Sequence, residues 1–182
     1  MPAQSGSNKI LKLMKRNYLI EEYIEFLEEI KTEIKEISII SDFIIGFPGE
    51  SKEDYLKTLE LIKKIKFKKL YLFNYSGREN TYAFSRYRET VNEETKKERF
   101  NEIVKTQNFI SEQIKNSMIN KDFKAFINKE KKNNLNIASL INDYKALIRI
   151  EEKDIETTID IKITKIENKI IYAEKNKCIK KY

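Results

Sequence analysis

The sequence of 182 residues contains no His, no Trp, one Cys, four Gly and two Pro. A structural zinc site of the usual Cys/His kind and a self-contained iron–sulfur cluster both need more ligands of these types than the chain provides. Ser-His-Asp and Cys-His catalytic centres are excluded in the same way, and a single cysteine excludes an intramolecular disulfide. Chemistry in this chain must therefore use carboxylates, lysines, tyrosines and backbone groups, or groups supplied from elsewhere.

Long apolar runs and targeting signals are also missing. The apolar run at 37–45 is interrupted by Ser and Asp and is far shorter than the roughly 20 residues of a membrane span. Residues 1–7 lack the basic and apolar regions of a signal peptide. These features predict a cytoplasmic protein that does not bind membranes.

Charge, in contrast, is abundant: 36 Lys+Arg stand against 29 Asp+Glu, for a net charge of +7. Part of this excess reflects a general bias toward Ile, Lys and Asn. Residues 1–111 carry 20 basic and 18 acidic residues, whereas residues 112–182 carry 16 and 11, so their net charges are +2 and +5. The basic excess toward the C-terminus is compatible with a nucleic-acid partner for that part of the chain.

The first part of the chain alternates between helical and strand patterns. Apolar residues at helical spacing predict a helix over 21–34, and the β-branched run at 38–45 predicts a strand buried on both faces. Ser51-x-x-Asp54 is a helix-start signal, and residues 69–75 form a second strand pattern. Strand, helix and strand at this spacing indicate a parallel βαβ unit, and hence an α/β fold.

A long helix and a strand-rich tail follow. Asn92 is the predicted N-cap of the helix, whose inner stripe is Phe100, Ile103, Gln107, Ile110, Ile114 and Met118. Period-two patterns then predict strands at 123–127, 144–150, 159–163 and 170–172, separated by polar stretches such as 128–134. Several short strands in succession predict a small barrel. We place the domain boundary near residue 115, which gives domains 1–115 and 116–182.

The segment with the strongest functional signal is Asp-Phe-Ile-Ile-Gly-Phe-Pro-Gly-Glu at 42–50. It holds two of the four glycines and one of the two prolines. A strand that enters this turn is predicted to present exposed backbone amides and a flat aromatic ring at its C-terminal end, where α/β folds bind ligands. The alternative is a tight βα turn without a ligand.

Two other polar segments accompany this turn: Gln-Ser-Gly-Ser-Asn at 4–8 and Tyr-Ser-Gly-Arg-Glu-Asn-Thr at 75–81. Small polar residues allow a ligand to approach the backbone closely, and Arg78 can bind a carboxylate or phosphate with two hydrogen bonds. A disordered N-terminus and a merely solvated arginine are the alternatives.

These three segments, together with Met14-x-Arg16-x-Tyr18, Lys-Lys-Glu-Arg at 96–99 and Gln107-Asn108, closely resemble the radical-SAM methylthiotransferase family. The most similar branch methylthiolates isopentenyladenosine beside the tRNA anticodon, and the branch that acts on threonylcarbamoyladenosine is the alternative. The resemblance covers residues 1–115, and more weakly residues 116–182, which are similar in strand spacing to the family's TRAM domain. It implies the C-terminal part of a partial (β/α) barrel, followed by a small OB-like RNA-binding β-barrel.

The resemblance implies S-adenosylmethionine as a cofactor and tRNA as a partner. Near the adenosyl group it places Ile44, Gly46, Phe47 and Pro48. At strand ends that face the barrel mouth it places Gln4, Ser5, Ser41 and Asp42, and the mouth would be closed by Asn74, Tyr75 and Arg78. Asn80 stands where the family has Gly, and Asn tolerates the positive φ that such a turn needs.

Cations and aromatics alternate in the C-terminal part, as in RNA-binding barrels. The predicted RNA-binding residues are Arg78, Lys121, Lys124, Lys131, Lys132, Lys145 and Arg149, interleaved with Phe123, Phe126 and Tyr144. The alternative is a solvated surface around core aromatics.

The family's chemistry depends on a Cys-x3-Cys-x2-Cys motif that holds a [4Fe–4S] cluster, and on a second cluster in a preceding domain. The single cysteine, Cys178, cannot replace these ligands. We therefore expect the chain to begin inside the barrel, to be inactive alone and to expose a strand edge and apolar faces. The missing N-terminal half on a separate chain is a candidate partner; a non-catalytic RNA-binding remnant, a pseudogene product and a mis-assigned start are alternatives.

Overall fold

The computed structural model describes residues 2–34 and 37–176. The chain divides into two compact units, Met1–Ser111 and Glu112–Tyr182. The division falls within the long helix α5 (Glu93–Asn116), close to the boundary that we placed near residue 115. The assignment of these units to the two named domains stays a prediction.

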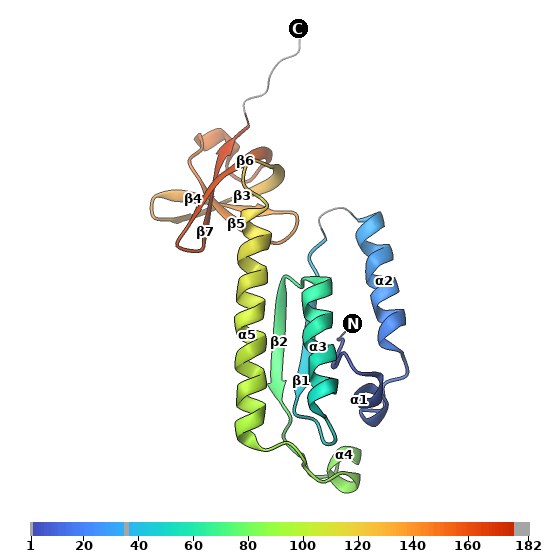
Figure 1. The fold of residues 1–182 in the computed structure, drawn as a ribbon. Coiled ribbons are helices and arrows are strands. Elements are labelled where there is room, and N and C mark those ends of the chain that lie inside the picture. The colour runs from blue at the N-terminus through green and yellow to red at the C-terminus, as the bar shows by residue number, and fades with distance from the viewer. Residues whose placement is uncertain (1, 35–36, 177–182) are drawn as a thin grey trace. The chain divides into compact units, whose positions relative to one another are not determined.

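Unit 1 contains a small parallel sheet and its covering helices (Figure 1). Strands β1 (Ile40–Ile45) and β2 (Lys69–Asn74) pair in parallel, with Ile40 opposite Lys69 and Ile45 opposite Asn74. The helices are α1 (Asn8–Leu13), α2 (Ile20–Glu33), α3 (Lys52–Ile65), α4 (Tyr82–Arg86) and α5. The predicted βαβ unit is therefore confirmed.

Residues at the N-terminus extend this sheet beyond β1. Gln4 forms an isolated parallel bridge with Phe43: its N–H donates to Asp42 O (2.9 Å), and its carbonyl accepts from Ile44 N (3.0 Å). The carbonyl of Ile45 instead accepts from Tyr75 N (2.8 Å), on the side of β2. Strand β1 thus has neighbours on both of its edges.

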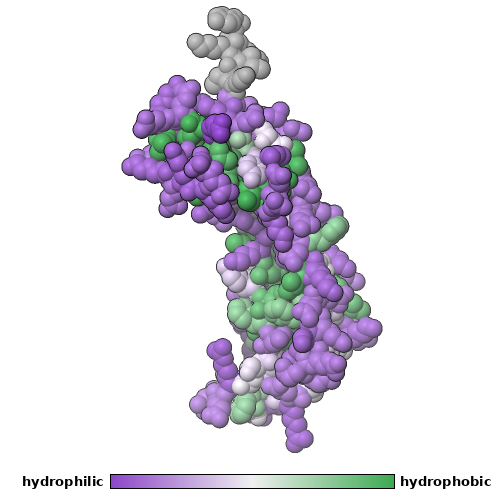
Figure 2. Space-filling model, turned by 90° about the vertical axis from the view of Figure 1, so that its left-hand side faces the viewer, coloured by the Kyte–Doolittle hydropathy of each residue, from purple (hydrophilic) through white to green (hydrophobic). Residues whose placement is uncertain are grey.

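The two faces of the sheet differ in burial. Ser41, Phe43 and Ile45 are buried on the face that packs against helices, where Phe43 meets Phe67 edge to face at 5.6 Å. The register places Ile40, Asp42 and Ile44 on the other face with Lys69, Tyr71 and Phe73. Tyr71 and Phe73 are 45% and 53% exposed, and Figure 2 shows hydrophobic side chains at the surface of this unit. The prediction that β1 is buried on both faces is therefore wrong, because no described element covers the second face.

Side-chain hydrogen bonds cap the N-termini of α3 and α5, the two long helices that follow β1 in this unit. In α3, Asp54 N donates to Ser51 Oγ (3.2 Å) and Ser51 N donates to Asp54 Oδ2 (3.0 Å), which is a reciprocal capping box. In α5, Thr95 N donates to Asn92 Oδ1 (2.8 Å). Both predicted helix starts are confirmed.

Unit 2 is a closed barrel of five strands in the order β3-β4-β5-β7-β6. The pair β5–β7 is parallel and the other pairs are antiparallel. The strands are β3 (Asp122–Lys132), β4 (Leu135–Leu140), β5 (Lys145–Ile148), β6 (Thr158–Glu167) and β7 (Ile170–Lys175), with a short 3₁₀ turn η1 (Glu152–Asp154) before β6. The predicted small barrel is confirmed in this coarse sense.

Strand β4 corrects the sequence prediction. Residues 128–134 were predicted as a polar separator, but 128–132 continue β3 and Asn133-Asn134 form a two-residue turn into β4. Both turn residues have positive φ (53° and 60°), which Asn tolerates and which tight hairpins of this type need. The polar composition concealed this hairpin, although the Asn-Asn pair is its signal.

The barrel interior is apolar. Strand β3 directs Phe123, Ala125 and Ile127 inward, and alternate residues of the other strands join them, together with Met118 from beyond the end of α5. Register shifts between Ile127 and Lys131 in β3, and in β6, bend the strands as closure requires. Met118, predicted on the helix stripe, thus belongs to the barrel core.

Candidate functional site

The turn at 46–50 lies at the C-terminal end of β1. Its glycines have positive φ, +73° at Gly46 and +85° at Gly49. Gly46 N donates to Glu50 Oε1 (3.1 Å), Gly49 N to Thr90 Oγ1 (2.8 Å) and Glu50 N to Phe47 O (2.9 Å). These three amides already have acceptors within the protein, so the expectation of exposed amides is wrong for them.

An aromatic cluster lies behind the turn. The Phe47 ring is buried and meets Tyr75 and Tyr87 edge to face, at centroid distances of 5.0 and 6.1 Å. Gly46 and Pro48 are buried with it. The structure thus brings Gly46, Phe47 and Pro48 together with Tyr75, and Phe47 is a packing residue and not an exposed flat ring.

Lys96, on α5, connects this turn to the end of β2. Its side chain is 1% exposed, and its Nζ donates to Tyr75 O (3.1 Å), Glu89 Oε2 (3.0 Å) and Glu93 Oε1 (2.7 Å). Burial alone would lower the pKa of Lys96, but Glu93 and Glu89 outweigh it, so the pKa is raised and the amine stays charged. A Cβ on Gly46 would lie 2.4 Å from Lys96 Cγ, so this glycine is required for space as well as for its φ.

A second cation of α5 holds the end of the same turn. Arg99 Nη1 pairs with Glu50 Oε1, and the Glu50 side chain is almost completely buried. Burial raises the pKa of Glu50 despite the neighbouring Arg99 guanidinium. We did not predict roles for Lys96 and Arg99 from the sequence. Lys96 does lie one helical turn before the inner stripe at positions 100, 103 and 107, and a lysine on such a stripe indicates a buried charge.

The polar N-terminal segment is ordered, which excludes the alternative of a disordered N-terminus. Ser5 Oγ lies 3.4 Å from Thr58 Oγ1 of α3, and Ser41 Oγ accepts from Ala3 N (2.8 Å) and lies 3.3 Å from Tyr23 OH of α2. Both serines are buried on the helix side of the sheet. Their position therefore differs from the barrel mouth, where we expected them.

The remaining predicted site residues of unit 1 lie in several places. Asp42 and Ile44 share the open sheet face with Tyr71 and Phe73, and Gln4 is buried at the sheet edge with a φ of +63°. Asn74 and Arg78 are exposed. The positive φ expected at Asn80 is confirmed at +65°.

The barrel distributes its predicted RNA-binding cations over three places. Lys131 and Lys132 end β3, and Lys132 is opposite Leu135 at the start of β4. Arg149 directly follows β5, at the end of that strand that pairs with the start of β4. On the outer surface, Lys124 flanks Phe126 along β3, and Lys145 is opposite Ser139, which is itself opposite Phe126. Lys121 precedes β3, and its carbonyl accepts from Ile163 N (3.1 Å).

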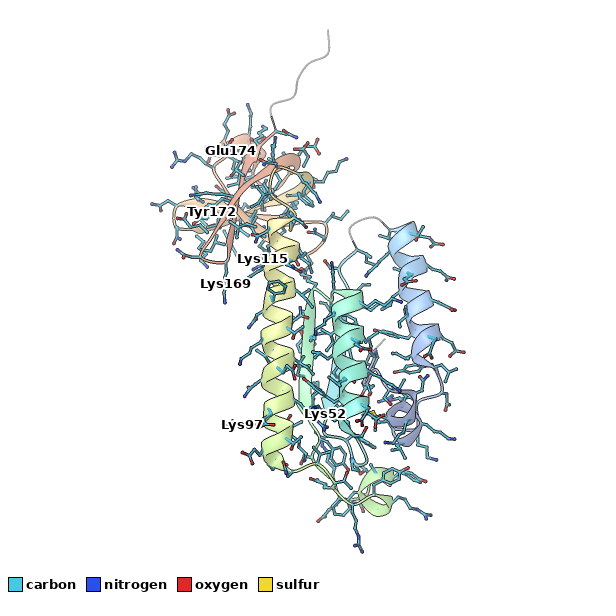
Figure 3. The ribbon with its side chains drawn as sticks, viewed as in Figure 1. Lys52, Lys97, Lys115, Lys169, Tyr172 and Glu174 are labelled. Carbon is cyan, nitrogen blue, oxygen red and sulfur yellow. The ribbon has the colours of Figure 1, made fainter. Side chains whose placement is uncertain are left out.

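The barrel cations also differ in pairing. Ion pairs join Lys129 to Glu156, Lys153 to Glu151, Lys165 to Glu167 and Lys175 to Asp154. None of the six predicted RNA-binding cations of the barrel forms a salt bridge with another described residue. Lys115, labelled in Figure 3, donates to the carbonyl of Lys169 (3.3 Å).

A [4Fe–4S] cluster does not fit the residues of this chain. Within residues 2–34 and 37–176, no three His, Cys, Asp or Glu side chains are grouped as metal ligands. Cys178 lies outside the described residues, and it is the sole cysteine of the sequence.

Within the described ranges 2–34 and 37–176, no helix is both long and apolar enough to cross a membrane.

The chain is similar to a known protein superfamily and to several known enzymes. Residues 1–62 match the model of the Radical SAM superfamily. The tRNA-2-methylthio-N(6)-dimethylallyladenosine synthase of Thermotoga petrophila is 35% identical over 174 residues, which are 96% of this chain and 39% of that protein. The protein of that name from Acetivibrio thermocellus is 41% identical over 134 residues, 74% of this chain and 28% of its own length. The chain therefore belongs to the radical-SAM methylthiotransferase family, as predicted, and spans less than half the length of these relatives.

Among solved structures, the apo form of Mycoplasma genitalium RNase R matches 46% of this chain and 17% of its own, with 14% identity and a TM-score of 0.31. This similarity is too weak to support an argument about fold or function.

Proposed function

We propose that this chain is the C-terminal portion of a radical-SAM tRNA methylthiotransferase that acts on isopentenyladenosine beside the anticodon. In this proposal, unit 1 forms part of the S-adenosylmethionine site and unit 2 is a TRAM-like barrel that binds tRNA. The observation that carries the proposal is the similarity to dimethylallyladenosine synthases over 96% of the chain, which includes both units.

The arrangement of unit 1 supports a ligand site. The turn at 46–50 follows a parallel strand at its C-terminal end, where such sheets bind ligands. From α5, Arg99 pairs with Glu50 of this turn, and Lys96 bonds the end of β2 beside it at Tyr75 O. We propose that S-adenosylmethionine, whose cleavage starts the reaction in this family, contacts the turn residues, Asn74 and Tyr75, and the open face at Asp42 and Ile44.

The cluster that this chemistry needs must be bound by residues outside this chain, because one cysteine cannot supply three thiolates. We propose that a further polypeptide segment, attached or separate, carries these ligands. The chain alone is then expected to bind RNA without cleaving S-adenosylmethionine.

The experiment uses the full chain, treated with iron and sulfide under reducing conditions. We expect no 5′-deoxyadenosine from S-adenosylmethionine, and salt-sensitive binding to an anticodon stem-loop that carries isopentenyladenosine. Addition of the separately purified N-terminal part of the Thermotoga petrophila relative should restore methylthiolation. Cleavage of S-adenosylmethionine by the chain alone would contradict the proposed division of labour, and a lack of RNA binding would contradict the role of the barrel.

A second candidate is an RNA-binding module without catalytic function, and it is favoured by the six predicted barrel cations that form no salt bridge with another described residue. Stem-loop binding that persists while the N-terminal part restores no methylthiolation would support this candidate. A matched stem-loop with threonylcarbamoyladenosine tests the alternative substrate branch.

A further inference from the structure

Phe126 is an outward-facing aromatic residue on the barrel. Along β3, Phe123, Ala125 and Ile127 point into the core, so Phe126 points outward, and it is 43% exposed. Core packing therefore does not explain an aromatic residue here, because exposure forgoes the free energy that a buried ring contributes.

The other aromatic residues in the described part of the barrel either belong to the core or already have a cationic partner. Phe123 and Tyr144 belong to the core cluster. Tyr172, labelled in Figure 3, has the Lys165 amine 4.9 Å from its ring centroid. No ring contact or cation–π contact occurs at Phe126 among the described residues. Its ring face is thus available to a ligand.

The neighbours of Phe126 on the outer surface are cationic and hydroxylic. Lys124 lies two residues earlier on the same strand, about 7 Å along it. Ser139 is opposite on β4 and Thr158 is opposite on β6. Lys145, opposite Ser139, lies two strand spacings away, roughly 10 Å. Asp160, opposite Lys124, is the acidic residue nearest in register, but the two form no salt bridge.

We propose that Phe126 is a stacking platform for an unpaired RNA base, with Lys124 and Lys145 positioned for the adjoining phosphates. This inference rests on the RNA-binding role proposed for unit 2, and it names the residue that would distinguish an unpaired strand from a duplex. A flat ring between separated cations matches a nucleobase between phosphates. An acidic peptide would satisfy the lysines but would leave the ring without a planar partner.

The test measures binding of the full chain to an anticodon stem-loop with 2-aminopurine in the loop, and to a fully paired duplex of the same length. For Phe126→Leu we expect about tenfold weaker binding to the stem-loop, loss of 2-aminopurine quenching and unchanged duplex binding. Phe126→Tyr should restore both affinity and quenching. Ile141→Ala, at another exposed apolar position of the barrel, is the control and should leave both unchanged.

Charge is tested separately. Lys124→Gln/Lys145→Gln should make stem-loop binding less salt-dependent, by a slope of about 1.4 for two single-strand phosphate contacts. Lys153→Gln, at an ion-paired lysine, should change this slope little.

The stacking role of Phe126 would be overturned if Phe126→Leu and the original chain bound the stem-loop equally well, with thermal unfolding showing that the barrel of the variant is still folded. RNA binding by the cations would then stand unaffected. Competition by poly-glutamate as effective as that by RNA would also overturn the stacking role. A chain that binds no RNA at all would overturn the proposed function itself, so the two failures are distinguishable.

Discussion

Unit 1 buries more polar side chains and exposes more large apolar side chains than unit 2. Of the ten buried polar or charged residues, eight lie in unit 1, whereas unit 2 has Asn136 and Asp154. Of the twelve exposed large hydrophobic residues, ten lie in unit 1 and two, Phe126 and Ile141, in unit 2. Both counts apply to the residues that the structure describes.

This difference follows from closure of the sheets. The barrel of unit 2 closes by pairing β6 with β3, so its strands have no open edges and their apolar sides fill one interior. The sheet of unit 1 stays open, and its second face, with Tyr71 and Phe73, has no described cover. Unit 2 therefore encloses its apolar side chains in one interior, whereas unit 1 leaves apolar side chains exposed and uses buried polar contacts near the end of its sheet.

The largest expected effect breaks the barrel alone. Ile127→Ala removes a fully buried side chain from β3, and such substitutions cost about 2–5 kcal/mol. We expect the unfolding transition of unit 2 to move to lower denaturant while that of unit 1 stays in place. Denaturation followed by hydrogen exchange, which reports each unit separately, is the measurement. Ile141→Ala, at a side chain 81% exposed, is the control with an expected change below about 0.5 kcal/mol; an equal shift in both units would show that they unfold together.

A smaller effect is expected from the buried lysine of unit 1. Lys96→Met keeps an unbranched side chain that is one atom shorter but removes the donor to Tyr75 O, and an unsatisfied group of this kind costs about 1–3 kcal/mol. We expect faster hydrogen exchange at residues 46–50 and 75–77 and an unchanged barrel. Lys97→Met is the matched control, because Lys97 is exposed on the same helix and points away from the sheet (Figure 3). Equal exchange in the two variants would refute the anchoring role of Lys96.

The smallest expected effect is a loss of stability of unit 1 at acid pH. Asp54 is buried; desolvation by itself raises its pKa, but hydrogen bonds from Lys9, Ser51 and Ser7 outweigh this and hold the pKa well below its usual value of 3.8. A carboxyl group with a lowered pKa stabilises the fold above its unfolded-state pKa, and this contribution disappears as pH falls through the folded-state value. Unit 1 should therefore lose stability as pH falls below about 4, and Asp54→Asn should remove this part of the pH dependence. Stability curves between neutral and acid pH test it; identical slopes for both proteins would contradict the assignment.

Much of the local structure could be predicted from the sequence, because its signals are local. Ser51-x-x-Asp54 and Asn92 begin helices as capping chemistry requires, and Asn80 has the predicted positive φ. The failures concern long-range packing. Strand β4 was missed because its polar residues include Asn136, which is buried and donates to Asn128 O (3.2 Å) across the hairpin.

The candidate site shows the same division. The sequence indicated the turn at 46–50 and the aromatic at 75, since glycine, proline and strand patterns identify a strand end. It could not indicate that Ser5 and Ser41 face the helices, or that the turn amides are already paired, because each depends on a partner from a distant element, such as Thr58, Ala3 or Thr90.

By itself, the sequence determined the family, the parallel βαβ unit, the basic C-terminal region and the lack of cluster ligands, because composition, motif order and periodicity are properties of the chain alone. The tertiary structure decided which charges are buried and which aromatic side chains are exposed. Lys96 and Lys97 are adjacent and chemically identical, yet one is enclosed among Tyr75, Glu89 and Glu93 and the other is in solvent. Phe123 and Phe126 differ in the same way, because the pleat of β3 turns one into the core and the other outward.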